Sequence, residues 1–198
     1  MQIRRLCGEE IQTIYENYFP EAFPKDEIRP WPLMKEHIRQ ERYPCWGCFD
    51  ESGQLCTYGF FFCFQEILLL DYLASLPGRR GGGLGGMFLR ELQKKLAGSP
   101  VLGEVEAPVS GDPQTDALRR RRIGFYLRSG FEAMGVMSRV YGVTYRIIAW
   151  GWNGSEEMLA EKLREMYREL LGPERCREHV EVWLEPVEPS RGENAGSI

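Results

Sequence analysis

The sequence has little histidine and no long apolar run, and each shortage excludes a class of site. Its only two histidines, His37 and His179, lie far apart in the chain, so a histidine-based metal cluster or a Ser-His-Asp triad has little material. A membrane-spanning helix needs about 18 consecutive apolar residues. The longest apolar stretch, around residues 60–76, is interrupted by Gln65, Glu66 and Asp71. We therefore expect no membrane contact.

The chain also lacks an excess of positive charge. Its 25 lysines and arginines are outnumbered by 29 aspartates and glutamates, which gives a formal net charge of −4. A general nucleic-acid-binding protein needs a basic field, and here the one basic run is RRRR at residues 119–122. The segment MQIRRLCGEEIQ contains an acidic pair before any apolar stretch, unlike a secretory signal peptide. We expect a cytoplasmic protein with no nucleic-acid partner.

Cysteine is present and clustered, because four of the six cysteines lie within nineteen residues: Cys45, Cys48, Cys56 and Cys63. One interpretation is a zinc site or a redox pair, which would require a turn within CWGC. We favour a second interpretation, in which the cysteines are small buried side chains on strands. Residues three or seven apart on a strand face opposite sides, so neither pair converges. We therefore expect no metal site and no disulfide.

The periodicity of apolar residues predicts alternating strands and helices in one α/β domain. Strands are expected at residues 2–6, 43–50, 55–64, 67–76 and 101–108, twice within 131–150, and at 179–186. Helices are expected at residues 8–18, 32–41, 84–96, 115–129 and 155–171. In the last strand Val180, Val182 and Leu184 are expected to face inward. We expect a domain over residues 1–150, a helix–strand extension packed on it over 151–188, and a disordered tail over 189–198.

The most informative segment is LPGRRGGGLGGMFLREL, residues 76–92, in which six of nine consecutive residues are glycine. It follows an apolar run typical of a strand buried on both faces and leads into an amphipathic helical pattern. The first amides of a helix lack internal partners, glycine lets a ligand approach the backbone, and Arg79 and Arg80 add positive charge. The segment predicts a phosphate or pyrophosphate site. The alternative is a flexible loop with no ligand.

Two common phosphate-binding motifs do not account for this loop well. A Walker A loop is excluded because no Gly-Lys-Ser/Thr follows the glycines. Gly81, Gly83 and Gly86 satisfy the dinucleotide pattern GxGxxG, and Glu106 lies twenty residues further on, where a ribose-binding acid is expected. That pattern normally opens a repeated strand–helix–strand sheet, whereas the strands before this loop look antiparallel. An NAD- or FAD-binding enzyme is kept as an alternative.

Two motifs together resemble the GNAT N-acetyltransferase superfamily. The family's acyl-CoA signature is Arg or Gln, two residues, Gly, one residue, then Gly or Ala, and here it is Arg80, Gly83 and Gly85. The second motif is a helix ending in an aromatic residue and Tyr, followed by Gly-Phe, and here it is FYLRSGF at residues 125–131. The resemblance covers about residues 1–150. The sequence departs from the family at RRRRIG, residues 119–124, where a CoA-binding Asn is common. These arginines are either a solvated helix face or a contact to a nucleotide phosphate.

The resemblance implies an α/β fold with a mixed sheet, in which the fourth and fifth strands are parallel and splay apart. Acetyl-CoA would be the cosubstrate, with its pantetheine arm between these two strands. The backbone amides of Leu73 and Ser75 would hold that arm and polarise the thioester carbonyl. Arg80, together with Arg79, would neutralise phosphate charge. The amides that would cradle the pyrophosphate belong to Gly81, Gly83, Leu84, Gly85 and Gly86.

The resemblance also implies direct attack of a primary amine on the thioester, with Tyr126 as the general acid for the leaving thiolate. The general base stays open among Asp71, Glu104 and Glu106. Glu104 and Glu106 are two residues apart on one strand face, so they either form an acidic acceptor pocket or are two solvated acids. A lone charge at Asp71 is costly in an apolar run, so this side chain is alternatively bonded to backbone.

The acceptor is not named by any of these motifs. The mild acidity of the chain and the Glu104/Glu106 pair favour a small cationic amine over a protein, and the extension is a possible homodimer interface. Besides the dinucleotide enzyme, a further alternative is a non-catalytic acyl-CoA-binding module. That alternative predicts CoA binding that is indifferent to Tyr126→Phe, with no turnover.

Overall fold

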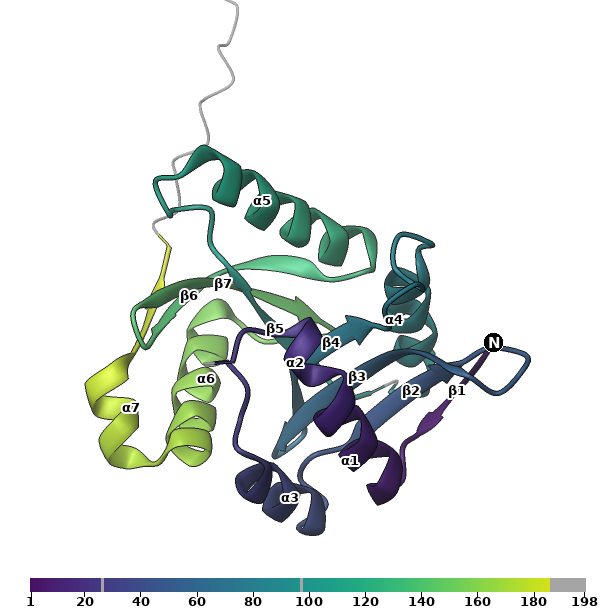
Figure 1. The fold of residues 1–198 in the computed structure, drawn as a ribbon. Helices are drawn as coiled ribbons and strands as arrows, with labels where there is room; N and C mark the ends of the chain where they lie inside the picture. Colours follow the sequence, from purple (N-terminus) through teal and green to yellow (C-terminus); the bar gives the residue numbers. More distant parts are fainter. Residues whose placement is uncertain (26, 97, 186–198) are drawn as a thin grey trace, which may run out of the picture.

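The computed structural model describes residues 1–25, 27–96 and 98–185, and its elements are labelled in Figure 1. The strands are β1 (Gln2–Arg5), β2 (Cys45–Phe49), β3 (Leu55–Phe64), β4 (Ile67–Ser75), β5 (Val101–Glu106), β6 (Glu132–Val140), β7 (Val143–Trp150) and β8 (Val180–Leu184). The helices are α1 (Gly8–Asn17), α2 (Phe19–Ala22), α3 (Trp31–Arg39), α4 (Leu84–Lys95), α5 (Pro113–Arg128), α6 (Glu156–Leu171) and α7 (Pro173–His179).

All eight strands form one mixed sheet in the order β1-β2-β3-β4-β5-β7-β6-β8. β4 and β5 run parallel and are joined through α4, while the other neighbouring pairs run antiparallel. A parallel pair needs a crossover connection, which α4 provides here. This arrangement confirms the predicted α/β fold with a mixed sheet. It contradicts the repeated strand–helix–strand sheet that the dinucleotide alternative requires.

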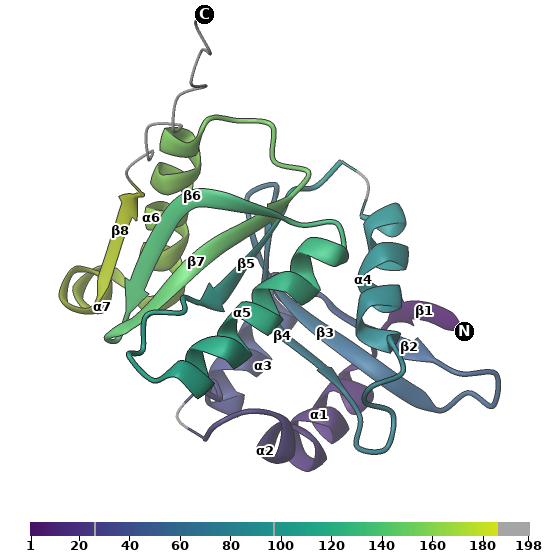
Figure 2. The ribbon, with the colours of Figure 1, turned by 90° about the horizontal axis from the view of Figure 1, so that it is seen from above.

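Helices cover both faces of the sheet (Figures 1 and 2). One face carries α1, α2, α3 and α6, whose apolar side chains form a core cluster with alternate residues of β3 and β4. The other face carries α4 and α5, and its cluster includes Phe61, Leu70 and Phe88. Below we call these the α1–α3/α6 face and the α4/α5 face. The sheet therefore lies between two layers of helices. A ligand can contact both layers only where neighbouring strands move apart.

A bulge in β4 changes which backbone groups face β5. Phe60 lies opposite Tyr72 while Phe61 lies opposite Leu70, so Asp71 is the extra residue. The Leu68 amide donates to Pro100 O, just before β5, whereas the Leu76 amide donates to Cys56 O on the opposite side. In an unbulged strand these two amides, an even number of residues apart, would point the same way.

The bulge has two consequences, one for the backbone and one for the side chains. After Asp71 the amides that point toward the β5 side are those of Leu73 and Ser75, by the alternation of the strand. The side chains of Asp71 and Tyr72 both lie on the α1–α3/α6 face, because both contact Arg29, which precedes α3.

The predicted elements are present, and the structure adds two helices that the sequence pattern did not predict. α2 lies in the proline-rich connection after α1, and α7 follows Gly172. Both are short and carry proline in the first turn, so neither shows a long apolar stripe. The inward orientation predicted for Leu184 is wrong, because this side chain is 37% exposed. It ends a strand that, among the described residues, lies at the edge of the sheet and pairs with β6, whereas Val180 and Val182 pack against the core.

The segment after residue 150 shares the core of the preceding residues. Leu159, Leu163 and Met166 of α6 belong to the same buried cluster as Phe60 and Leu102, and β8 extends the sheet by pairing with β6. The boundary at residue 150 stays a prediction. The disordered tail predicted for 189–198 lies outside the described residues.

The CWGC cysteines lie on opposite sides of β2, as strand alternation predicts. Cys45 belongs to the core of the α1–α3/α6 face and Cys48 to that of the α4/α5 face. Burial raises the pKa of both thiols, which disfavours the reactive thiolate. Across residues 1–25, 27–96 and 98–185, no three His, Cys, Asp or Glu side chains are placed to hold a metal ion. Every helix in these ranges is too short or too polar to cross a membrane.

Candidate active site

The two parallel strands of the sheet separate partway along their length. β4 and β5 pair only where Leu68–Leu70 face Val101–Gly103. Beyond this point β4 continues to pair with β3 as far as Ser75, and β5 continues to pair with β7 as far as Glu106. Unpaired backbone groups on facing edges require partners. The bulge directs the Leu73 and Ser75 amides to this opening, which matches the predicted splay.

The glycine loop is an open surface at the start of α4. Gly81 and Gly83 have positive φ angles of 86° and 74°, which side-chain-bearing residues rarely adopt. A Cβ added at either residue, or at Gly82, would meet no atom within 4 Å. Gly83 is the N-cap of α4 and provides no side-chain cap. The amides of the first helical turn, Leu84 onward, therefore point outward without helical partners.

The two sequence motifs pack against each other in space. A Cβ at Gly85 would lie 3.3 Å from Phe125 Cζ, and one at Gly86 would lie 3.3 Å from Ser129 Oγ. The end of α5 therefore approaches the first turn of α4 closely because these residues lack side chains. This contact brings the end of α5, which carries Tyr126, against the start of α4. Its ring lies between those of Phe125 and Phe131, with centroids 5.0 and 5.6 Å away.

Tyr126 is partly exposed and stays protonated at neutral pH. Burial of the ring raises the pKa of its hydroxyl to about 12, against a smaller lowering by Arg122. The hydroxyl is therefore a proton donor to any stronger base that forms next to it. Its backbone carbonyl accepts the Phe131 amide at 3.2 Å, which joins the end of α5 to the strand that follows.

The two loop arginines have different environments. Arg79 Nη2 donates to Asp50 Oδ2 at 2.7 Å and to Gln54 Oε1 at 3.2 Å, so its guanidinium is held by the β2–β3 turn. Arg80 Nε donates to Ser75 O at 3.4 Å, and this residue is otherwise exposed at the end of β4. Of the two, Arg80 is the one whose charge lies at the opening between β4 and β5.

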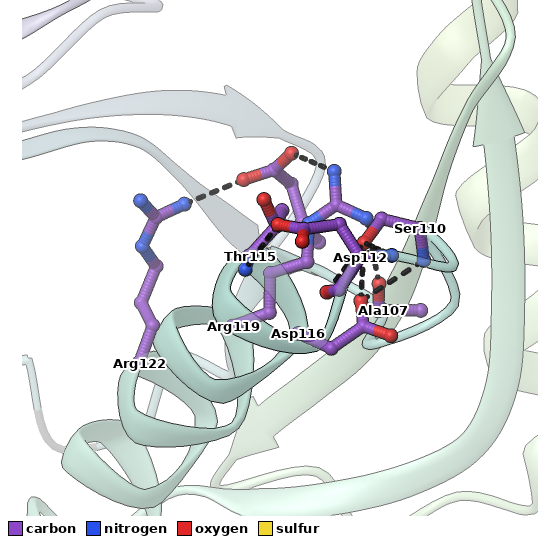
Figure 3. A network of polar contacts seen from close by, with 8 residues as sticks. Ala107, Ser110, Asp112, Thr115, Asp116, Arg119 and Arg122 are labelled. Carbon is purple, nitrogen blue, oxygen red and sulfur yellow. Dashed lines mark hydrogen bonds and ion pairs between the residues drawn. The ribbon is translucent and has the colours of Figure 1, made fainter.

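Glu106 ties the end of β5 to α5 through ion pairs with Arg119 and Arg122, two α5 residues that are labelled in Figure 3. Arg119 Nη2 contacts one carboxylate oxygen at 2.6 Å and Arg122 Nη1 contacts the other at 2.8 Å. Arg119 also donates to Ala107 O at 3.1 Å. Two cations thus neutralise Glu106. In the dinucleotide alternative the Glu106 carboxylate would bind a ribose. Here both of its oxygens already bind arginine side chains.

Asp71 is held by side chains, and not by the backbone groups considered from the sequence. Arg29 Nη2 lies 3.2 Å from Asp71 Oδ2, and the Tyr43 hydroxyl donates to the same oxygen. The neighbouring Tyr72 hydroxyl donates to Glu27 O at 2.7 Å and accepts the Arg29 amide at 2.9 Å. The bulge therefore lets two consecutive residues hold one segment, 27–29, over the α1–α3/α6 face.

Glu104 is partnered by hydroxyl groups. The Tyr167 hydroxyl, from α6, donates to Glu104 Oε1, and Ser138 Oγ lies 3.4 Å from the same atom. Burial raises the pKa of Glu104 to about 7, and the two hydroxyls lower it by less. The residue as a whole is intermediate between buried and exposed. Among the three acids predicted as base, this one lacks a hydrogen-bonded cation within the described part of the chain.

Glu104 and Glu106, two residues apart on β5, have different partners in the structure. Glu104 contacts β6 and α6, whereas Glu106 contacts α5. Tyr145 of β7 lies opposite Glu106 in the sheet. Burial and then the charges of Glu104, Glu27 and Glu106 raise the pKa of Tyr145. Tyr145 therefore lies within electrostatic range of all three acids.

Sequence reasoning missed the partners of these acids. Tyr167 is 63 positions from Glu104, Ser138 is 34 positions away, and Arg29 is 42 positions from Asp71. No local spacing relates them, so no sequence signal was available. A separate surface groove of about 630 Å³ lies where Arg90, Trp150 and Asn153 meet. It contains none of the predicted site residues.

Comparison with known proteins places this site in context. No family model matches the chain. The chain is 30% identical over 158 residues to the Bacillus subtilis (strain 168) protein provisionally named acetyltransferase YjbC, covering 76% of this chain and 77% of that one.

Two solved structures share the fold. A protein from Bacteroides thetaiotaomicron, provisionally described as a GNAT-family acetyltransferase, has a TM-score of 0.70 at 23% identity, covering 87% of this chain and 99% of its own. Spermidine N-acetyltransferase from Vibrio cholerae, solved with CoA and spermine, has a TM-score of 0.57 at 11% identity, covering 75% of this chain and 93% of its own. At these identities both likenesses concern the fold alone.

Proposed function

The chain belongs to the GNAT superfamily of N-acetyltransferases, and on this premise we propose that it transfers the acetyl group of acetyl-CoA to a small primary amine. One observation carries the proposal. The opening between β4 and β5 is followed along the chain by the uncapped start of α4, and the end of α5, which carries Tyr126, packs against that start. A thioester in this opening would meet backbone donors on one side and a proton donor on the other.

The α4/α5 face suits the nucleotide part of CoA. Backbone amides at the start of α4 bind anions through their free N–H groups and the helix dipole. The amides proposed for the pyrophosphate are those of Gly81, Gly83, Leu84, Gly85 and Gly86. Arg80 adds a full charge at the end of β4, and Arg79 is proposed to leave the β2–β3 turn when a phosphate approaches.

The opening itself suits the pantetheine and the thioester. The β4 amides of Leu73 and Ser75 point toward the β5 side and lack a strand partner there within the described residues. We propose that they hydrogen-bond the pantetheine and the thioester oxygen. Donors fixed in advance around a developing oxyanion stabilise it without reorganisation.

We propose Glu104 as the general base. Asp71 is paired with Arg29, and Glu106 is paired with two arginines, so protein cations already occupy the place beside each carboxylate that a substrate ammonium would take. Glu104 has hydroxyl partners and a pKa of about 7. A base is most effective when its pKa is near the working pH.

The protons balance as follows in the proposed reaction. Glu104 accepts one proton from the substrate ammonium, directly or through water, and later releases it to solvent. The amine nitrogen forms the new C–N bond as the C–S bond breaks. Tyr126 donates its hydroxyl proton to the departing thiolate. The second proton that the nitrogen loses restores the Tyr126 hydroxyl through water, so one proton is released per turnover.

We propose a small cationic amine as the acceptor. The support is the Glu104 carboxyl group, which follows directly on the last paired residue of β5 and has no hydrogen-bonded cation within the described residues. A structural neighbour, the spermidine N-acetyltransferase of Vibrio cholerae, is named for such a substrate. We also propose a cytoplasmic location. A homodimer through the edge strand β8 is proposed in addition, which sedimentation of the purified protein tests.

The first experiment is thermal melting with acetyl-CoA, CoA, NADH or FAD. A ligand at about one hundred times its dissociation constant adds roughly 2.7 kcal/mol of stability. We expect a rise in melting temperature with acetyl-CoA and CoA only, on the order of 5 °C. A rise with NADH or FAD alone would overturn the proposal and restore the dinucleotide alternative.

The second experiment separates an enzyme from a binding module. Release of the CoA thiol is followed with acetyl-CoA and a panel of small amines. We expect turnover with one or more diamines or polyamines, and a loss of about 10²–10⁴ in turnover for Tyr126→Phe with unchanged CoA binding. CoA binding without turnover on any amine, protein amines included, would instead support the non-catalytic module.

A further inference from the structure

Helix α6 lies outside the segment that carries both GNAT motifs. Its Tyr167 places a phenol against Glu104 of β5. The Tyr167 hydroxyl donates to Glu104 Oε1 and lies 2.9 Å from Ser138 Oγ. Tyr167 and Ser138 are both almost fully buried. Three elements, β5, β6 and α6, thus meet at one carboxyl group.

The phenol is held in place by the packing of its helix. Leu159, Leu163 and Met166 of α6 are buried in the α1–α3/α6 core, and Tyr167 follows directly on the same stripe. Ser155 caps the helix by accepting the Met158 amide at 3.3 Å. A close-packed side chain of this kind sits in a low-energy rotamer with little space to move. The hydroxyl position is therefore set by the tertiary structure of the helix and not by local flexibility.

The three groups can satisfy both charge states of Glu104. A phenol has one proton to donate and can accept as well. When Glu104 is charged, the Tyr167 proton points to the carboxylate. When Glu104 holds a proton, that proton can point to the Tyr167 oxygen, and the Tyr167 proton can turn to Ser138 Oγ. No buried donor or acceptor among the three is stranded in either state.

We propose that Tyr167 is a positioning residue for catalysis, which orients Glu104 and stabilises its charged form so that it works as a base near neutral pH. This inference rests on the proposed function, because it concerns the base of that reaction. It assigns a role to α6: the helix after residue 150 completes the amine side of the active site. Ser138, which contacts both Glu104 and Tyr167, is a second positioning residue.

The other charged or titratable groups near Glu104 do not change when Tyr167 is altered. Asp71 on β4 raises the pKa of Glu104 and Arg29, before α3, lowers it. Tyr145 on β7 also faces it, and Glu106 is the nearest acid along β5. Since all four remain in a Tyr167 variant, a change in the titration of Glu104 there reports on the lost hydroxyl.

The test is the pH dependence of kcat/KM with one amine in wild type and in Tyr167→Phe. The variant keeps the ring and loses the hydrogen bond to a charged group, so the pKa of Glu104 rises. We expect the acidic limb to move upward by about one pH unit, with the rate recovering at high pH. An equal loss of rate at every pH would mean a purely structural role and would overturn the inference.

A matched control is Tyr58→Phe. Tyr58 is also a fully buried tyrosine, and its hydroxyl has no hydrogen-bond partner within the described residues. We expect the acidic limb of kcat/KM against pH for Tyr58→Phe to coincide with that of wild type. A similar shift in both variants would show that loss of any buried phenol perturbs the profile, which contradicts a specific role for Tyr167.

A second measurement does not depend on turnover. The glutamate side-chain carboxyl groups are labelled with 13C and titrated by NMR, and the Glu104 signal is identified by its absence in Glu104→Gln. We expect its midpoint to rise by about one pH unit in Tyr167→Phe and by less in Ser138→Ala, which serves if the first variant does not fold. Coincident titrations in wild type and variants would overturn the inference. If wild type acetylates no amine, the proposed function fails separately.

Discussion

The two faces of the sheet build their halves of the candidate site in different ways. On the α4/α5 face the site is made largely of backbone: glycines with positive φ, the free amides of a helix start, and a Gly–Phe contact between two motifs. On the α1–α3/α6 face it is made of side chains from β4, β5, β6, β7 and α6. Backbone groups are enough to bind a cosubstrate that a whole superfamily shares. Selecting an amine and removing its proton require particular side chains.

The difference explains why one half resembles a large superfamily and the other does not. Backbone donors recognise phosphate groups without side-chain identity, so glycine at a few positions is enough. The pKa of Glu104 depends on how much water is excluded around it and on which hydroxyls reach it. Variants that touch one face alone should therefore separate cosubstrate binding from chemistry.

The largest effect is expected on the amine side from Glu104→Gln. This change removes the proposed base and keeps the shape of the side chain. We expect kcat/KM to fall by about 10²–10⁴ with acetyl-CoA binding unchanged. Steady-state kinetics with calorimetry of CoA binding measures both. Equal losses of binding and turnover would contradict the separation of the two faces.

The next effect is on stability, from Asp71→Asn at the bulge. The side chains of Asp71 and Arg29 are only 16% and 12% exposed, so the change leaves a nearly buried guanidinium without its counter-ion. We expect a loss of about 3 kcal/mol in the free energy of unfolding, measured with urea. The matched control is Glu181→Gln, which breaks an exposed pair with Arg139 and should cost about 0–1 kcal/mol. Equal losses in the two variants would refute the clamp of segment 27–29 by Asp71.

The pH dependence of stability distinguishes the two faces in the absence of any ligand. The pKa of Glu104 is raised to about 7 in the folded chain, from an ordinary 4.5. The folded state therefore binds its proton more tightly, and the contribution of this group to stability is full below pH 4.5 and is lost as the pH rises toward 7.

Glu104→Gln does not titrate, so it should become more stable relative to wild type as the pH rises from about 5 to 8. We expect a relative gain of about 2 kcal/mol, measured by urea unfolding at both pH values. Parallel stabilities across this range would show that Glu104 has an ordinary pKa. The same comparison with Tyr126→Phe should show no such trend, because Tyr126 stays protonated throughout.

The smallest effect is expected on the backbone side, from Gly83→Val. At a φ of 74° a β-branched residue is strained, and the N-cap of α4 shifts to relieve it. We expect acetyl-CoA to bind about tenfold more weakly, with the acidic limb of the rate profile unmoved. Gly82→Ala is the matched control, because Gly82 does not have positive φ and its Cβ would meet nothing within 4 Å. Equal weakening in both would show that loop flexibility, and not the geometry at Gly83, matters.

Much of the fold was predictable because it depends on short-range patterns. The strand over 55–64, the helix from Leu84 and the turn at Tyr141-Gly142 follow from alternation, helical spacing and glycine. α2 and α7 were not predictable in this way, because four and seven residues with proline in the first turn carry too little periodic signal. Leu184 shows the same limit, since alternation states which residues share a face but not whether anything covers that face.

The sequence by itself determined the side that we propose to bind phosphate, because the glycines, the helix start and the aromatic-Tyr motif are each encoded in consecutive residues that act locally. Only the tertiary structure decided the amine side. The bulge at Asp71 depends on the register with β3, and the charge state of Glu104 depends on burial and on Tyr167, 63 positions away. Desolvation and long-range contacts set a pKa, and neither is a property of neighbouring residues in the chain.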